Sequence, residues 1–186
     1  MPGKDRVAVI LVALPGMGKT AIGTLLARTM PNAKKIEQDD FYKGRVADHQ
    51  AYLHAVRRGI RKQDLVLCKN HHTAAQRHEV LAIARRSGAR VIIANLVPPG
   101  LASMTEEERD VHLDRLLDRI EGRHDGSSHL VIDAAHSRAR ARQVIKHAFW
   151  KTYEEPCGPY LQLDYTDSVA KNADAILQAC LQSRLQ

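Results

Sequence analysis

The sequence has few aromatic residues and no long apolar run. Aromatic side chains make up 4% of its 186 residues, and no apolar stretch approaches the roughly 18 residues that a membrane-spanning helix requires. The three cysteines, Cys68, Cys157 and Cys180, have neither the spacing of a metal site nor that of an obvious disulfide set. The N-terminus leads into an apolar strand and not into the core of a signal peptide. These absences predict an intracellular protein, cytoplasmic or nuclear, that has no membrane partner.

Acidic residues are outnumbered by basic ones. The chain has 28 Lys and Arg against 21 Asp and Glu, a formal net charge of +7, and basic residues cluster at 57–62, 85–90 and 138–142. A triphosphate alone needs only a few cations, so the surplus favours a polyanion such as nucleic acid as a partner. Each cluster taken alone is equally consistent with a solvated helix face.

A glycine-rich segment follows the first apolar run. Val7–Val12 is expected to be a buried strand, and residues 13–20 after it read Ala-Leu-Pro-Gly-Met-Gly-Lys-Thr. This is the layout of a P-loop, in which backbone N–H groups and the N-terminus of the next helix bind phosphate, Lys19 reaches the outer phosphates and Thr20 holds Mg²⁺. Ala13 stands where the usual motif has its first glycine. The expected contacts to the nucleoside triphosphate are Gly16, Met17, Gly18, Lys19, Thr20 and Ala21.

Apolar runs alternate with longer helical stretches along the chain. Strands are predicted at residues 7–12, 33–36, 65–68, 90–95 and 160–163. Helices are predicted at 18–30, 46–60, 73–87, 105–120, 136–153 and 167–183, the fourth beginning with a capping box formed by Thr105 and Glu108. The alternation predicts an α/β protein with a five-stranded parallel sheet, helices on both faces and a helical lid. No repeat or linker divides the chain, so residues 1–186 are expected to form a single domain.

Polar residues follow the second and third predicted strands, where the carboxyl ends of a parallel sheet bind ligands. Asp39 and Asp40 follow the second strand, and a carboxylate there can accept a proton from an attacking hydroxyl or orient Mg²⁺. Asn70, His72 and Arg77 follow the third strand and suit hydrogen bonds to a phosphate and an unstacked base. The alternatives are helix caps, supplied by the acidic pair in the first case and by Asn70 or Thr73 in the second.

Three arginines spaced by four precede the most loop-like part of the chain. Arg115, Arg119 and Arg123 share one face if the helix continues through them. Arginines over the nucleotide can neutralise the charge that develops on a transferred phosphoryl group. The alternative is ion pairing with neighbouring acidic residues on the helix surface.

Taken together, these segments resemble the central kinase domain of fungal-type tRNA ligases, a polynucleotide 5′-hydroxyl kinase of tRNA splicing and RNA repair. The family's P-loop also tends to begin with Ala, and residues 38–40, Gln-Asp-Asp, are similar to its Gln-Asn-Asp stretch. Residues 70–77 are similar to its Asn-Asn-His…Arg motif, with His71 replacing the second Asn. Cys68 stands where the family usually has an Asp. Residues 119–123 are similar to its Arg-x-x-x-Arg lid motif, and residues 163–172 to its closing strand and turn.

The resemblance implies transfer of the γ-phosphoryl of GTP, or of ATP, to the 5′-OH end of RNA such as a tRNA exon half. It implies a kinase domain that belongs to a multidomain RNA ligase. Nothing in the sequence suggests an oligomeric seam, so the domain is expected to be monomeric. Catalysis is expected from Lys19, Asp40, Arg119 and Arg123. Acceptor contacts are expected from Asp39, Asn70, His72 and Arg77.

Two other functions remain open from the residues. A small-molecule kinase of the nucleoside monophosphate, shikimate or gluconate type would share the P-loop and the lid. A non-catalytic, nucleotide-dependent RNA-binding module would also have the P-loop, but it would not require Lys19, Thr20 and Asp40.

Overall fold

The computed structural model describes residues 6–43, 46–121 and 138–185. Its centre is a five-stranded sheet with the strand order β2-β5-β1-β6-β7, in which all neighbouring strands are parallel. The strands are β1 (Val7–Val12), β2 (Ala33–Glu37), β5 (Asp64–Cys68), β6 (Arg90–Asn95) and β7 (Leu161–Gln162). The predicted α/β fold with five parallel strands is confirmed.

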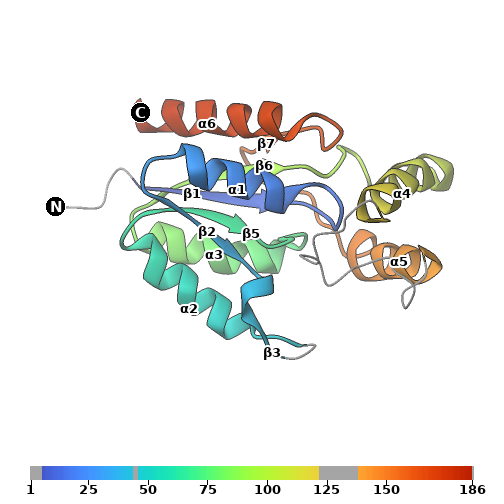
Figure 1. Ribbon diagram of the computed structural model, residues 1–186, viewed down its shortest axis with the longest axis horizontal. Helices are drawn as coiled ribbons and strands as arrows, with labels where there is room; N and C mark the ends of the chain where they lie inside the picture. The colour runs from blue at the N-terminus through green and yellow to red at the C-terminus, as the bar shows by residue number, and fades with distance from the viewer. Residues whose placement is uncertain (1–5, 44–45, 122–137, 186) are drawn as a thin grey trace.

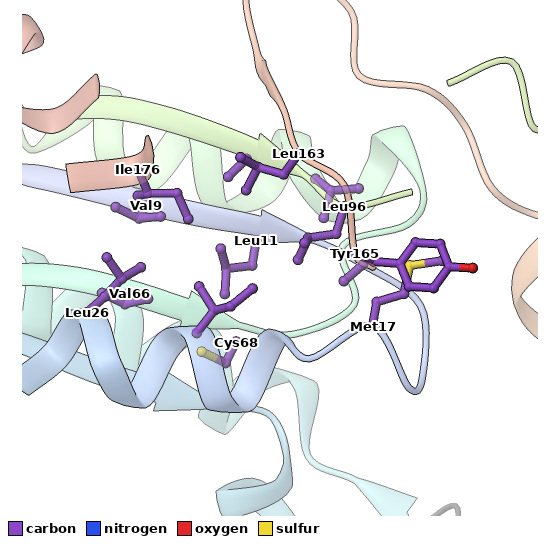
Figure 2. Packing of buried hydrophobic residues seen from close by; sticks show 14 of the residues in the cluster. Val9, Leu11, Met17, Leu26, Val66, Cys68, Leu96, Leu163, Tyr165 and Ile176 are labelled. Carbon is purple, nitrogen blue, oxygen red and sulfur yellow. The ribbon is translucent and has the colours of Figure 1, made fainter. Parts of the chain in front are cut away.

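Helices cover both faces of this sheet (Figure 1). On one face lie α1 (Lys19–Thr29) and α6 (Val169–Leu185), and on the other lie α2 (His49–Ile60) and α3 (Ala74–Arg86). Successive side chains of a strand point to opposite faces. Accordingly, Val7, Val9 and Leu11 belong to the apolar cluster under α1 and α6, shown in Figure 2, whereas Ala8 and Ile10 belong to the cluster under α2 and α3.

A further helical layer lies beyond the carboxyl edge of the sheet (Figure 1). It consists of α4 (Glu106–Glu121), α5 (Arg138–Val144) and the π-helical segment η2 (Ile145–Trp150). The predicted capping box begins α4: the N–H of Thr105 donates to Glu108 Oε2 at 2.8 Å, and the N–H of Glu108 donates to Thr105 Oγ1 at 3.2 Å. A separate apolar cluster joins these elements, formed by Leu113, Leu117, Ile120, Ala141 and Ile145.

Two element boundaries differ from the prediction. The helix expected from residue 46 begins at His49, because the Asp48 side chain caps it by accepting the N–H of Ala51 at 2.9 Å. The residues before it form a short antiparallel hairpin, β3 (Tyr42–Lys43) and β4 (Val46–Ala47). The helix expected over 136–153 changes at Ile145 to π-helical hydrogen bonding. Within the described ranges, no helix has the length and apolar content that crossing a membrane requires.

Candidate active site

The P-loop joins β1 to α1 at the carboxyl edge of the sheet. Gly16 and Gly18 have φ angles of 89° and 85°, in the left-handed region that favours glycine. Gly18 is the N-cap of α1, and no side chain caps this helix end. The N–H groups of the first helical turn are therefore placed to donate to an anion, as a phosphate-binding helix start requires. Lys19 and Thr20 are the first two residues of the helix and are half-buried.

Buried side chains and hydrogen bonds hold the first part of the P-loop, residues 13–17, in place. Ala13, Leu14 and Met17 are buried, and the N–H of Ala13 donates to Asn70 O at 3.0 Å. The N–H of Leu14 donates to Met17 Sδ at 3.3 Å, and the N–H of Met17 donates to Leu14 O at 3.2 Å. The Met17 side chain therefore supports the loop, which leaves its backbone as the group that can meet a phosphate. Ala13 does not have a positive φ, so alanine fits this position without strain.

Helix α4 lies against both P-loop glycines. A Cβ atom on Gly16 would be 3.0 Å from Leu116 O, and a Cβ on Gly18 would be 3.3 Å from Arg119 Nη2. The Arg119 guanidinium donates a hydrogen bond to Tyr165 O and lies 5.8 Å from the centroid of the Tyr165 ring. The structure thus brings the positive charge of Arg119 to the phosphate-binding loop.

Tyr165, for which the sequence analysis predicts no specific role, positions Arg119. This residue follows β7, is 2% exposed and lies with Met17 at the P-loop end of the core in Figure 2. Its hydroxyl is 2.8 Å from His112 Nδ1 on α4. Burial raises the pKa of Tyr165 and lowers the pKa of His112, so both groups stay neutral near pH 7. Arg123, the second arginine of the predicted lid, lies outside the described residues.

The acidic pair lies on a single turn of 3-10 helix, η1 (Asp39–Phe41), directly after β2. Both carboxylates are exposed. Burial raises the pKa of the neighbouring Cys68 thiol to about 12; Lys19 opposes this shift and Asp40 adds to it. Lys19 and Asp40 therefore both lie close enough to Cys68 to shift its pKa. The protonated thiol donates to Lys19 O at 3.7 Å, so the end of β5 supports the start of α1.

His71 is a structural residue. It is fully buried, with Nδ1 3.1 Å from Leu11 O and Nε2 3.1 Å from the Tyr52 hydroxyl. Because a carbonyl oxygen can only accept, Nδ1 carries the proton. Burial lowers the pKa of His71 to about 3, so the ring is neutral and Nε2 accepts from Tyr52. These two bonds hold the loop after β5, where His71 has a φ of 48°, against β1 and α2.

Arg77 faces the protein backbone. It is 3% exposed, and its guanidinium donates to His71 O at 2.9 Å and to Glu155 O at 3.2 Å. Its bonds tie the loop after β5 to the segment that leads into β7. The helix cap considered in the sequence is present, since Thr73 Oγ1 accepts the N–H of Gln76 at 3.3 Å.

Asn70 and His72 each have a buried polar atom that lacks a hydrogen-bond partner among the described residues. His72 is 8% exposed, and its ring packs edge-on against Phe149 at a centroid distance of 5.1 Å. Burial is the main cause of its lowered pKa, so the ring is neutral near pH 7. Within the described part of the chain, His72 Nδ1 and Asn70 Oδ1 are buried without a hydrogen-bond partner. Such atoms are costly unless a ligand or water satisfies them.

Comparison with known proteins identifies the fold. No protein-family model and no curated protein matches the sequence. A fungal RNA kinase superposes with a TM-score of 0.64 at 16% identity, covering 98% of this chain and 88% of that one. A gluconokinase from Sinorhizobium meliloti gives 0.62 at 13% identity, covering 97% and 95%. An APS kinase from Mycobacterium tuberculosis, in complex with AMPPNP and APS, gives 0.55 at 15% identity, covering 97% and 99%. The chain therefore has the fold of the P-loop kinases.

Proposed function

We propose that this chain is a polynucleotide kinase that transfers the γ-phosphoryl group of GTP or ATP to the 5′-OH end of RNA. The observation that carries the proposal is the α1 start at Gly18, which has no side-chain cap and has the Arg119 guanidinium beside it. An uncapped helix start binds phosphate, and a cation beside it stabilises the charge of a phosphoryl group in transfer. RNA as acceptor is supported by the motif resemblance, the net charge of +7 and the shared fold with a fungal RNA kinase.

In this proposal the donor lies on the P-loop. Backbone N–H groups of residues 16–21 and the Lys19 ammonium hold the outer phosphates, and Arg119 contacts the transferred group. Arg123 is proposed as a second lid arginine. Tyr165 fixes the Arg119 guanidinium through its carbonyl oxygen.

The acceptor lies beside η1 in this proposal. The 5′ oxygen forms a bond to the γ-phosphorus as the bond from that phosphorus to the bridging oxygen breaks, and the hydroxyl proton passes to the Asp40 carboxylate. Asp39 assists in orienting the acceptor. The unpartnered polar atoms of Asn70 and His72 are proposed to bond its terminal nucleotide. Arg77 acts through the loop that carries them, which it braces at His71 O.

The donor groups also fit magnesium. Mg²⁺ prefers oxygen ligands and is usually held by one or two protein groups together with phosphates and waters. The Thr20 hydroxyl and the Asp39 and Asp40 carboxylates are such groups, whereas the protonated Cys68 thiol is not. The described residues contain no set of three or more His, Cys, Asp or Glu placed to hold a metal without the nucleotide. When bound, Mg²⁺ would neutralise part of the phosphate charge.

A kinase acting on a small molecule is the second candidate, because the gluconokinase and the APS kinase share this fold with TM-scores of 0.62 and 0.55.

Within the first proposal, residues 1–186 are the kinase unit of an RNA ligase, and the joining chemistry belongs to other domains.

A labelling assay separates the candidates. The purified chain is given GTP or ATP labelled at the γ-phosphate, with a 5′-OH oligoribonucleotide, the same oligonucleotide carrying a 5′-phosphate, gluconate, APS or a nucleoside monophosphate. Label on the 5′-OH RNA alone, lost in Lys19→Ala, is the expected result. Label on a small acceptor would establish the second candidate. Nucleotide binding with no labelled acceptor would leave a non-catalytic module.

A further inference from the structure

A basic groove runs along the outer edge of the sheet. It lies between the edge strand β2 and helix α2 and has a volume of about 190 Å³. Asp40 and Phe41 line it at the carboxyl end of β2, and Gln63 lines it where α2 leads into β5. Four basic side chains contribute to its walls: Lys34, Lys35, Arg58 and Lys62.

Three of these four charges have no ion-pair partner among residues 6–43, 46–121 and 138–185. Lys35 pairs with Glu37 at 2.9 Å and donates to Thr24 Oγ1 at 2.9 Å. In the described part of the chain, Lys34, Arg58 and Lys62 are exposed and form no ion pair. The groove therefore concentrates positive charge next to the carboxylate proposed to receive the acceptor proton.

The basic cluster at residues 138–142 is different. Arg138 pairs with Asp118 and with Glu121, both at 2.8 Å, and Arg142 pairs with Asp110 at 2.9 Å and with Asp114 at 2.7 Å. Helix α4 thus neutralises Arg138 and Arg142 of that cluster. The cluster at 57–62 has no ion pair with any residue that the structure describes, and part of it faces the groove.

An aromatic ring lies in the groove beside Asp40. Phe41 is half-buried and packs edge-on against Tyr52, with ring centroids 5.9 Å apart, which fixes its orientation. Sites for single-stranded nucleic acid combine cations that follow the phosphates with aromatic rings on which bases stack. The groove has both kinds of group.

We propose that this groove binds the single-stranded RNA that follows the 5′-terminal nucleotide of the acceptor. The inference rests on the proposed function, since Asp40 is both the proposed proton acceptor and a wall of the groove. A base stacks on Phe41, and the next phosphates contact Lys34, Arg58 and Lys62. The strand then leaves along β2 toward the amino edge of the sheet.

The test compares two triple variants with the same change in charge. The groove variant is Lys34→Gln, Arg58→Gln and Lys62→Gln. The control is Arg57→Gln, Arg61→Gln and Arg85→Gln, three exposed arginines that do not line the groove. Thermal unfolding checks that both are folded.

Binding is measured by the fluorescence anisotropy of a labelled 5′-OH oligoribonucleotide over a range of salt concentrations. Each lost phosphate contact lowers the slope of log Kd against log salt by about 0.7 for a single strand, so the groove variant should lose about 2 and the control less than about 0.7. An equal slope in the wild type and the groove variant would overturn the proposal. The proposal would also be overturned if poly-glutamate bound more tightly than RNA in a salt-dependent way, because the groove would then be assigned to an acidic protein segment.

Acceptor length separates this proposal from the proposed function. The groove variant should phosphorylate the oligonucleotide with kcat/KM lowered by about tenfold or more at moderate salt. It should phosphorylate a nucleoside 3′-phosphate as the wild type does, because this acceptor meets Asp40 but is too short to reach Lys34, Arg58 and Lys62. Equal loss on both acceptors would overturn the groove assignment. If the wild type phosphorylates no RNA, the proposed function fails, and the binding slopes still decide whether the groove holds RNA.

Discussion

Helix α1 packs on β5 at Gly23. The contact is so close that the effect of replacing Gly23 should depend on the neighbouring residue, Cys68. A Cβ atom added to Gly23 would lie 2.1 Å from Cys68 Sγ, a distance at which something must move. The next neighbours, Lys35 Cδ at 3.5 Å and Val66 Cγ1 at 3.6 Å, are at ordinary contact distances. The cysteine sulfur is therefore the only one of these three atoms that excludes alanine from this position.

The magnitudes follow from two opposing effects. Alanine is favoured over glycine inside a helix by about 1 kcal/mol. Overpacking a well-packed core costs about 1 to 3 kcal/mol, and a 2.1 Å approach belongs at the upper end of that range. Gly23→Ala should therefore lower the free energy of unfolding by about 2 kcal/mol. In a Cys68→Ala background the sulfur is absent, so the same substitution should raise the free energy of unfolding by about 0.5 to 1 kcal/mol.

Urea unfolding of the wild type, the two single variants Gly23→Ala and Cys68→Ala, and the double variant gives the coupling energy between the two positions directly. The nucleotide-binding site provides a second measurement, because Cys68 Sγ–H donates to Lys19 O at the start of α1. Gly23→Ala alone should weaken nucleotide affinity, and adding Cys68→Ala should restore part of it. A stabilising Gly23→Ala in the presence of Cys68, or strict additivity of the two changes, would refute the packing argument.

Three further predictions concern the candidate site. Asp40→Asn should lower turnover by about 10² or more with nucleotide affinity unchanged, because a positioned base is lost; an equal loss in Asp39→Asn would mean that the two carboxylates act as a pair. Arg119→Ala should depress kcat far more than it weakens nucleotide binding, since a transition-state contact contributes little to the ground state. Unchanged turnover would mean that Arg119 has only a structural role, through its contacts with Tyr165. Because burial lowers the pKa of His71 from 6.5 to about 3, the folded state excludes a proton that the unfolded state binds. The free energy of unfolding should then fall as the pH drops below 6.5, by roughly 3 kcal/mol at about pH 4. Urea titrations that show the same pH dependence in His71→Gln would contradict this.

The sheet and its helices could be predicted because their patterns are local. Alternating or continuous apolar runs marked the strands, and the P-loop fixed where the first strand meets the first helix. The hairpin of β3 and β4 was missed because its strands have only two residues each, too few to show a period. The helix start at His49 was missed because Val46 and Ala47 are compatible with a helix, and only the Asp48 cap sets the boundary.

The candidate site was less predictable, because the direction of a side chain depends on distant elements. Adjacent histidines look alike in the sequence, yet His71 is fixed by Leu11 and Tyr52, whereas His72 Nδ1 is buried without a partner among the described residues. Arg77 was expected to meet the acceptor, but its guanidinium donates to backbone carbonyls that come together only in the folded chain. The catalytic and binding roles, and the placement of the domain in an RNA ligase, stay predictions.

The pairing of α4 with α5 explains why a net charge of +7 says little by itself about where a polyanion would bind. Acidic residues recur every four positions along α4, and Arg138, Arg142 and Lys146 recur every four positions along α5 and η2. These two rows face each other, as the ion pairs of Arg138, Arg142 and Lys146 with α4 show. Exposed pairs of this kind contribute little stability, so the apolar cluster between the helices holds them together and the ion pairs set their alignment. Among the described residues, the charge left to attract a polyanion is therefore the charge that no ion pair neutralises, and at the sheet edge it lies beside Asp40.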